Sequence, residues 1–382
     1  MAKLGDIATI QSGGTPARSI AEYWEDGTIP WVKISDIKSK YLNQTEEMIT
    51  EAGLENSSAK IFPKGTILYT IFATLGETSI LDINAATNQA IAGISITDSR
   101  VLPDYLYYYL LSQKIHVQKI GRGVAQNNIN MKLLRDFDVP LPSKEAQLNI
   151  IEQLNRVTEL LFLRKQQLTK LDELIKARFV EMFGDMLLNS LEWPEKPMES
   201  LAEIVSGITK GRKTTETGLI EVPYMAVSNV KSGYIDWTTI KTILATKQEI
   251  EQYRLMPDDI LMTEGGDPDK VGRGAIIKNP LENSIHQNHI FRVRLDKSEL
   301  LPAYFAEYLQ HQKAKRYFLG CAKQTTGIAS INMRQLRALP VLIPPLSLQN
   351  QFAAFVAEVD KSKLLAELFA QSTCILAENR SK

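Results

Sequence analysis

Two long stretches of the chain carry apolar residues at alternating spacings of four and three positions. The first stretch follows Pro142 and the second follows Pro345, and Ser143 and Ser347 stand where a helix N-cap is favoured. A sustained repeat of this kind predicts long helices that pair along an apolar seam rather than cover a sheet. The residues predicted to form the seam are Leu154, Val157, Leu161, Leu168, Leu171 and Ile175 in the first helix, and Phe352, Phe355, Val359 and Phe369 in the second.

The segments that precede each helix have a different pattern. Short runs rich in Ile, Val, Thr and Tyr are broken by Gly, Pro, Asn and Asp, which is typical of strands joined by turns. A helix of about 40 residues is roughly 60 Å long, too long to fold back into a small β-rich domain. Two such helices with matching seams most simply pair with each other, although separate packing of each helix on its own domain is the alternative.

The two halves of the chain repeat one another. Residues 29–39 match residues 222–232, and residues 129–132 match residues 331–334. Three further matches follow in the same order, with an offset that grows slowly along the chain. These matches align Pro63 with Pro257, Pro103 with Pro302, and Ser143 with Gln147 against Ser347 with Gln351.

We therefore predict an α+β protein with two similar β-rich domains in tandem, each followed by a long helix. The two helices are expected to pair as an antiparallel coiled coil with pseudo-two-fold symmetry. The predicted boundaries are residues 1–142 and 185–346 for the β-rich domains, and residues 143–184 and 347–382 for the helices.

Composition narrows the function. The chain has 44 basic and 44 acidic residues, so a polycation that coats nucleic acid is excluded, although local basic clusters are not. Its two cysteines, Cys321 and Cys374, provide neither a disulfide framework nor a cysteine-based zinc site. No stretch approaches the roughly 20 apolar residues that span a bilayer, and the N-terminus lacks the apolar core of a signal peptide. We therefore expect a cytoplasmic protein without a membrane partner.

Two polar loops at equivalent places in the repeats suggest contact with a polyanion. Residues 121–130 combine flexible glycines with an arginine and amides, and residues 323–332 are their counterpart. Amides and Arg are the side chains that read base edges, although the amides could instead satisfy backbone groups at a helix start. The candidate DNA-binding residues are Thr15, Arg18, Lys33, Ser35, Lys38, Arg122, Gln126, Asn127, Asn128, Lys210, Arg212, Lys213, Asn229, Lys231, Lys270, Arg273, Lys323, Gln324 and Thr325.

The sequence lacks the common catalytic motifs. The sequence has no dinucleotide fingerprint, no P-loop and no Asn/Asp-Pro-Pro-aromatic motif of an adenine methyltransferase. Acidic residues between Asp258 and Asp269 lack the order that a metal-dependent nuclease needs. His286 and His289 stand in a segment that alternates like a strand, so they should project to opposite faces rather than chelate one ion. We expect no catalytic and no metal-binding residues in this chain.

A family resemblance adds to this reading. Ser12-Gly13-Gly14-Thr15-Pro16, Tyr23-Trp24 and Ile29-Pro30-Trp31 with Asp36 resemble the opening of a target recognition domain in the specificity subunits of type I restriction–modification systems. Residues 179–184 resemble that family's central conserved region, and the spacings Pro142 to Gln147 and Pro345 to Gln351 resemble its helix starts. The second repeat has residues 206–212 in place of the GGTP motif, which implies a different half-site.

The resemblance implies a bipartite double-stranded DNA target, with one half-site for each recognition domain. It also implies two methyltransferase subunits that carry S-adenosylmethionine, and restriction/translocase subunits, while this chain holds no cofactor. Two other functions stay open: a stand-alone DNA-modifying enzyme with degenerate motifs, and an assembly scaffold whose domains bind protein. The second helix has no equivalent of residues 179–184, so the extent of its pairing is open.

Overall fold

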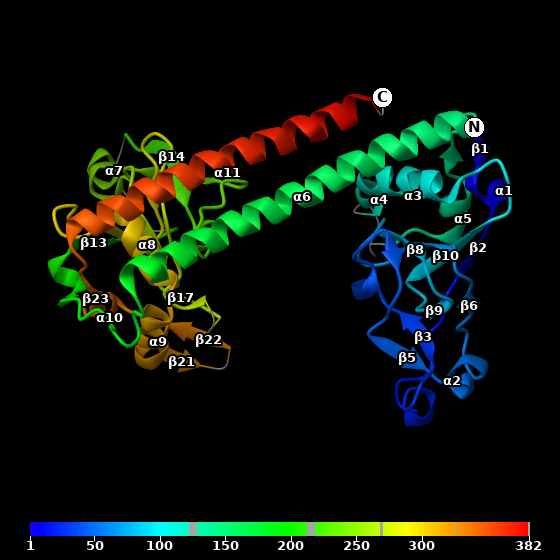
Figure 1. Ribbon diagram of the computed structural model, residues 1–382, viewed down its shortest axis with the longest axis horizontal. Helices are drawn as coiled ribbons and strands as arrows, with labels where there is room; N and C mark the ends of the chain where they lie inside the picture. Colours follow the sequence, from blue (N-terminus) through cyan, green and yellow to red (C-terminus); the bar gives the residue numbers. More distant parts are fainter. Residues whose placement is uncertain (122–127, 212–217, 268–269, 326, 381–382) are drawn as a thin grey trace. The chain divides into compact units, whose positions relative to one another are not determined.

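The computed structural model describes residues 1–121, 128–211, 218–267, 270–325 and 327–380. The chain divides into two compact units, which are Met1–Phe162 with Thr373–Lys382, and Leu163–Ser372. The long helices α6 (Lys144–Phe183) and α11 (Leu346–Arg380) each belong partly to both units (Figure 1). The boundaries between the units fall inside these two helices, whereas the predicted domain boundaries fall at the helix ends. The predicted domain boundaries therefore stay a prediction. Among the described residues, no helix has the length and apolar character that crossing a membrane requires.

The first unit is built on mixed β-sheets. Its five-stranded sheet has the order β2-β10-β7-β8-β4, and a four-stranded sheet has the order β5-β3-β9-β6. The strands are β1 (Ala2–Lys3), β2 (Ala8–Ser12), β3 (Ile29–Val32), β4 (Tyr41–Leu42), β5 (Glu47–Ile49), β6 (Ile61–Phe62), β7 (Ile67–Thr70), β8 (Thr78–Leu81), β9 (Ala85–Thr87), β10 (Ile91–Ile96) and β11 (Asp138–Val139). The helices are α1 (Leu4–Ile7), η1 (Ala21–Tyr23), η2 (Ile34–Asp36), α2 (Glu51–Glu55), α3 (Pro103–Ser112), α4 (Lys114–Gly121) and α5 (Met131–Arg135).

The second unit has the corresponding elements. Its four-stranded sheet has the order β13-β20-β16-β18, and two three-stranded sheets have the orders β15-β14-β19 and β17-β22-β21. The strands are β12 (Glu195–Pro197), β13 (Ala202–Ser206), β14 (Ile220–Met225), β15 (Lys241–Ala245), β16 (Ile260–Thr263), β17 (Gly265–Gly266), β18 (Gly274–Ile276), β19 (Ile285–His286), β20 (Ile290–Leu295), β21 (Lys323–Thr325), β22 (Ile328–Ser330) and β23 (Pro340–Leu342). The helices are η3 (Met198–Ser200), η4 (Val227–Asn229), α7 (Lys247–Tyr253), α8 (Pro302–Gln310), α9 (Gln312–Cys321) and α10 (Met333–Arg337).

Matched residues of the repeat form matched local structures. Asn130 caps α5 by accepting a hydrogen bond from Leu133 N at 2.8 Å, and Asn332 caps α10 by accepting one from Gln335 N at 3.0 Å. An Asn at this position satisfies a backbone N–H that the first turn of a helix leaves free. The matched sequence segments therefore form the same local structure in both units.

The start of each long helix is tied to its own unit by a buried glutamine. Oε1 of Gln147 accepts from Leu102 N at 3.0 Å, and its Nε2 donates to Arg100 O and Pro142 O. Gln349 makes the same three bonds, accepting from Leu301 N and donating to Glu299 O and Pro344 O.

The alignment of Gln147 with Gln351 was therefore wrong, because Gln349 is the counterpart and Gln351 is exposed. Ser143 caps α6, with Ala146 N donating to its Oγ at 3.2 Å. Ser347, however, lies inside α11, which begins one residue earlier at Leu346. The helix therefore begins before the predicted cap, so Ser347 is not the N-cap of α11.

Within the second unit the long helices run antiparallel and form part of one core. Phe179 of α6 contacts Phe352 of α11 with ring centroids 5.5 Å apart, and Asp172 pairs with Lys363 at 2.6 Å. Residues earlier in α6 thus meet residues later in α11, as an antiparallel pair requires. Of the predicted seam, Ile175, Phe352 and Val359 are buried in this core, and Leu171 and Phe355 pack against it.

The remaining predicted seam positions are partly covered. Leu154, Val157, Leu161 and Leu168 are each less exposed than the residues that directly flank them in α6. Ile151, rather than Ile150, is the buried residue near the start of the helix, where it joins the core of the first unit. The side chain of Phe369 lies outside the described part of the chain.

Candidate nucleic-acid interface

The strand order of the second unit brings several polar loops to one sheet edge. β13 and β16 both pair antiparallel with β20, with Ser206 opposite Phe291 and Thr263 opposite Ile290. The ends of β13 and β16 therefore lie beside the start of β20. β18 begins at the same edge, and β22 joins it through the pairing of Gly265 with Ser330. We call this edge, with the described residues 207–211, 264–267, 270–273, 286–289, 323–325 and 327–330, the loop edge of the second unit.

Several predicted residues come together at this edge. Lys210, Lys270 and Arg273 lie on its loops, where Lys270 pairs with Asp267, and Lys323 begins β21. Nε of Arg273 is buried without a hydrogen-bond partner. Gln324 and Thr325 belong to β21 at the same edge, but their side chains lie outside the described part. Arg212 and Lys213 are also outside it. The described residues of the loop edge thus carry four basic side chains, Lys210, Lys270, Arg273 and Lys323, against the two acidic side chains of Glu264 and Asp267.

The first unit builds the same edge from equivalent strands. Ser12 at the end of β2 pairs with Ala92 and Thr70 at the end of β7 pairs with Ile91, so both strands end beside the start of β10. Asn128 forms a bridge with Phe72, which follows β7. We call residues 13–18, 71–77, 87–90 and 128–129 the loop edge of the first unit. Arg122, Gln126 and Asn127 were predicted here but lie outside the described residues.

A tight turn opens each loop edge. Gly14 N donates to Thr87 O at 2.8 Å, and Ile208 N donates to His286 O at 2.9 Å. A Cβ on Gly207 would lie 1.9 Å from His286 O, so the close approach of the two backbones requires glycine. The carbonyl of this turn accepts from Trp31 Nε1 in the first unit and from Tyr224 OH in the second. Residues 206–209 thus fold like the GGTP motif they replace.

Three of the predicted cations in the first unit are engaged in an internal network. Arg18 pairs with Glu47 at 2.5 Å and its guanidinium carbon lies 3.6 Å from the ring centroid of Trp24. Lys33 pairs with Glu46 and Glu47 at 2.9 Å, and these carboxylates raise the pKa of the Lys33 ammonium. Lys38 completes the network with Glu46 at 3.4 Å. The positive charge of this group is therefore compensated by neighbouring carboxylates.

The candidates next to the loop edges differ in accessibility. Asn229 is buried, and its amide accepts from Ala226 N and donates to Asp236 O and Thr239 O. We correct its assignment, because an amide that satisfies buried backbone groups is not offered to a ligand. Lys231 lies 3.9 Å from Asp236. Ser35 is exposed on η2, and Thr15 donates to Gln89 at the loop edge.

The structure also shows exposed residues that the sequence did not single out as binding residues. His289 Nδ1 lies 2.6 Å from Glu264 Oε2, which ties the start of β20 to the end of β16 at the loop edge. Gln89 occupies the corresponding edge of the first unit. In the sequence, only their position just before a strand marks Gln89 and His289. An alignment of the two repeats could have shown this shared position.

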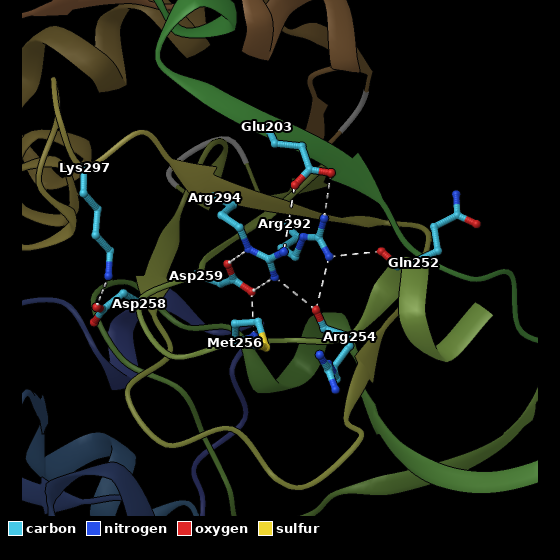
Figure 2. Close-up of polar contacts among 9 residues, drawn as sticks. All are labelled: Glu203, Gln252, Arg254, Met256, Asp258, Asp259, Arg292, Arg294 and Lys297. Carbon is cyan, nitrogen blue, oxygen red and sulfur yellow. Dashed lines mark hydrogen bonds and ion pairs between the residues drawn. The ribbon is translucent and has the colours of Figure 1, made fainter. Parts of the chain in front are cut away.

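Acidic residues considered for a nuclease are dispersed among different partners. Asp259 is 1% exposed and accepts two hydrogen bonds from Arg294 at 2.8 Å, whereas Asp258 pairs with Lys297 at 2.6 Å (Figure 2). Arg292, which is also buried, donates to Gln252 O and Arg254 O. Within the described residues, no group of His, Cys, Asp and Glu side chains is placed to hold a metal ion. His286 is buried and His289 is exposed, so these side chains do not converge.

The buried ion pair is a local feature of the second unit's sheet. At the positions that correspond to Asp259 and Arg294, the first unit has Thr66 and Ser95, whose hydroxyl oxygens are 3.2 Å apart. The same two strands are thus linked by two hydroxyls in one unit and by a carboxylate and a guanidinium in the other. We interpret this pair as structural, because Asp259 precedes β16 and Arg294 lies near the end of β20, at the end of these strands opposite the loop edge.

The fold and the loop edges together define a protein with two tandem mixed α/β domains, each presenting a polar edge built from the same strand ends. A family model described as the type I restriction modification DNA specificity domain matches residues 1–173 and 191–370. The chain therefore belongs to this family.

Curated relatives carry the corresponding names. The MjaIX specificity subunit of Methanocaldococcus jannaschii is 28% identical over 251 residues, which are 60% of this chain and 58% of that protein. The EcoKI specificity subunit of Escherichia coli K12 is 21% identical over 384 residues, which are 94% of this chain and 81% of that protein. Both are named as specificity subunits of type I restriction enzymes.

Solved structures share the fold. The S subunit of a type I restriction–modification system from M. genitalium superimposes with a TM-score of 0.51 at 15% identity, covering 99% of this chain and 93% of that chain. A chain from a study of complex assembly and conformational transition of the type I system gives a TM-score of 0.55 at 16% identity, with the same coverage. At these identities the likeness establishes the fold alone.

Proposed function

We propose that this chain is the DNA sequence-recognition subunit of a type I restriction–modification complex and performs no chemistry itself. Each unit reads one half of a bipartite target in double-stranded DNA. Two methyltransferase subunits, which bind S-adenosylmethionine, and restriction/translocase subunits supply the reactions, and the complex acts in the cytoplasm. Family membership supports the recognition role, and the partners extend the proposal beyond it.

One observation carries the proposal of two half-sites. The loop edges of the two units are built from equivalent strand ends with the same backbone hydrogen bonds, yet they present different side chains. In the first unit Ile71 N donates to Ala90 O at 2.9 Å, and in the second Glu264 N donates to His289 O at 3.0 Å. A common frame with exchanged side chains is what two related domains need to read two different sequences.

The chemistry of the edges suits a duplex. Exposed cations at the edge, such as Lys210 and Lys323, can approach phosphates, and exposed amides and histidine can approach base edges. The net charge of zero leaves little non-specific attraction to DNA. Affinity then has to come from the local sites and from partner subunits that surround the duplex.

The long helices offer a surface for the methyltransferase subunits. Leu160, Leu163 and Leu174 of α6 are exposed although they are large and apolar. At 100° per residue these three positions fall within about 60° of one another, on a face that lies beside the seam residues. We propose that this face binds a methyltransferase subunit, because such a contact would remove apolar surface from water.

Competition binding with the assembled complex tests the recognition role. The target is first identified by sequencing methylated positions in the DNA of a host that carries the chain and its partners. The complex should then prefer the target duplex to a scrambled duplex of equal length and charge. Equal binding to both would support an assembly scaffold instead. Methyl transfer or cleavage by the isolated chain with DNA and S-adenosylmethionine would support an enzyme.

Alanine at Gln126, Asn127 and Asn128 tests the division into half-sites. This variant should lose discrimination at one half-site and retain it at the other. Equal weakening on target and scrambled duplexes would contradict base readout by this loop.

Charge insertion on the exposed helix face tests the docking proposal. Leu163→Glu should abolish co-purification of the methyltransferase subunit while leaving the unfolding midpoint within a few degrees, because the side chain is already exposed. Thr169→Glu, which inserts the same charge at an exposed position about 120° around α6 from Leu163, provides the control. Unchanged co-purification of the Leu163 variant would exclude this face as the docking surface.

A further inference from the structure

We infer that His289, oriented by Glu264 and flanked by Asn288, determines which base the second unit reads in its half-site. This inference rests on the proposed function and adds the side chains that discriminate. The recognised group is an exocyclic amino group on a base edge in the major groove, which adenine and cytosine present.

The position of His289 is fixed by its backbone. Glu264 N donates to His289 O at 3.0 Å, and Ile331 N donates to Glu264 O at 2.8 Å, so β16, β20 and β22 hold the pair together. On the other side, Asn288 N donates to Ile208 O at 3.0 Å and Ser206 Oγ donates to Asn288 O at 2.6 Å. The side chains therefore project from a rigid frame rather than from a free loop, as a reading group must.

The Glu264 carboxylate sets the hydrogen-bonding character of the imidazole. A carboxylate accepts hydrogen bonds, so the 2.6 Å contact assigns the proton of the neutral ring to His289 Nδ1. Nε2 is then the acceptor. Its contact with Asn288 Nδ2 is 3.5 Å, which is too long to satisfy it. The His289 side chain is 56% exposed, so Nε2 can accept from an amino group, while the Asn288 amide can donate and accept beside it.

The first unit shows that the pair is not needed for the fold. Its equivalent positions are Ile71 and Ala90, where Ile71 N donates to Ala90 O at 2.9 Å and Ile129 N donates to Ile71 O at 3.0 Å. These are the same two backbone bonds that hold Glu264 and His289. The backbone is thus kept while the side chains change from apolar to a carboxylate and an imidazole. A side-chain exchange on a constant frame at the binding edge indicates specificity rather than stability.

The surroundings of the pair suit DNA. Lys210 and Lys270 lie on neighbouring loops of the same edge and Lys323 begins β21 there, where lysines can contact phosphates near the base that is read. The pair itself is not a phosphate site, because the Glu264 carboxylate would repel an anion. A base edge with an amino group is the part of the duplex that matches an acceptor.

The experiment uses the assembled complex and duplexes in which each base pair of both half-sites is varied in turn. His289→Ala, which introduces the residue of the first unit, should relax discrimination at one base pair of the second half-site by about tenfold to a hundredfold. The first half-site should stay fully discriminated and serves as an internal check that the protein is folded. Glu264→Gln should relax the same base pair, because Glu264 acts by orienting His289.

A matched control lies at the opposite end of the same two strands. Lys297 and Asp258 form an exposed ion pair that also links β20 to β16, at 2.6 Å. Lys297→Ala removes a comparable contact away from the loop edge and should leave the discrimination pattern unchanged.

The outcomes separate this inference from the proposed function. If the wild-type complex shows no sequence preference, the proposed function fails. If the wild type discriminates and His289→Ala discriminates equally at every position, the inference alone fails. Uniform weakening of His289→Ala on target and scrambled duplexes would also overturn it, because that pattern indicates a phosphate contact.

Discussion

The amide oxygen of Gln147 accepts a hydrogen bond from the backbone N–H of Leu102 at 3.0 Å, at the point where the β-rich part of the first unit meets its long helix. Gln349 forms the same bond with Leu301 at 2.8 Å in the second unit. Both glutamines have no exposed surface. Each glutamine lies in the first turn of a long helix, and its amide is hydrogen-bonded to both the residue before a shorter helix and the turn that follows a strand. The orientation of the long helix on its own unit therefore depends on one amide.

Gln349→Leu should lower the free energy of unfolding by about 2–4 kcal/mol. The change leaves a buried N–H and two carbonyls without their partner, and each unsatisfied buried group costs about 1–3 kcal/mol. Urea unfolding of the chain measures the effect. Gln351→Leu is the control, because Gln351 is exposed two residues further along the helix and should change stability by less than about 0.5 kcal/mol. Equal effects of the two substitutions would contradict the role of Gln349.

Burial of His286 should make the second unit sensitive to acid. Removal from water, with a smaller effect of the Arg292 charge, lowers the pKa of His286 to about 4. The folded state therefore binds its proton less tightly than the unfolded state, whose pKa is about 6.5. The contribution of neutral His286 to the free energy of unfolding is fully present above pH 6.5 and is lost as the pH falls toward 4. At pH 5 the loss is about 2 kcal/mol.

His286→Thr tests this pH dependence, because Thr87 is the buried residue at the equivalent position of the first unit. Urea unfolding at pH 7.5 and at pH 5 should give a smaller difference for the variant than for the wild type. His116, which is exposed on α4, provides the control as His116→Thr and should keep the wild-type difference. An unchanged difference in His286→Thr would exclude His286 as the acid-sensitive group.

Glu307 should have the opposite pH dependence. Burial raises the pKa of the Glu307 carboxyl, and the charges of Asp172 and Asp360 raise it further. The charges of Lys176 and Lys363 lower this pKa, but offset the increase only in part. The folded state thus binds this proton more tightly than the unfolded state, so the carboxylate costs stability at neutral pH and the cost disappears as the pH falls. Glu307→Gln should raise the unfolding midpoint at pH 7.5 and have no effect at acid pH. A lower midpoint at pH 7.5 would show that the ionised carboxylate is stabilising.

Phe352 should be essential for the packing of the long helices in the second unit. Its ring packs edge-on against both Phe179 and Phe183, with centroids 5.5 Å from each, and it has no exposed surface. Phe352→Ala should cost about 3–5 kcal/mol through lost burial and the cavity left behind. Hydrogen exchange should also become faster in residues 163–183 of α6. Leu364→Ala, at an exposed position of α11, should change neither measurement.

The buried pair of Asp259 and Arg294 should be replaceable as a pair but not singly. Asp259→Thr removes the acceptor of two Arg294 hydrogen bonds, and because the Arg294 side chain is 37% exposed, we expect a loss of about 1–3 kcal/mol. The double variant Asp259→Thr with Arg294→Ser introduces the two hydroxyl residues of the first unit. It should be more stable than either single variant, which a double-mutant cycle of unfolding free energies measures. Additive effects of the two substitutions would contradict a direct interaction.

Local features were predicted from the sequence because they depend on neighbouring residues. The Ser143 cap, the mixed α/β composition and the positions of the long helices follow from short-range spacing and propensity. The 4-3 spacing also located the seam, because the buried side of a helix repeats with the helix itself. Family membership rested on motifs that are local as well, and the comparison with the family model confirmed it.

Accessibility and partnership were not predictable in the same way. Asn229 and Ser35 are both polar residues in matched loops, yet one is buried and the other is exposed. Arg18 and Lys33 were chosen for their charge, but Glu46 and Glu47, just before and at the start of β5, form ion pairs with them. Gln351 looked like the counterpart of Gln147 because both follow a proline and a serine, whereas the hydrogen bonds of Gln349 depend on a segment 48 residues away.

The sequence by itself determined that the chain is duplicated, that each half joins strands to a long helix, and to which family it belongs, because these properties are recorded in local order. Only the tertiary structure decided which side chains meet at the loop edges. Glu264 and His289 are 25 residues apart and become neighbours solely through the pairing of β16 with β20. Such contacts arise from strand register and burial, which depend on the whole fold at once and leave no fixed spacing in the chain.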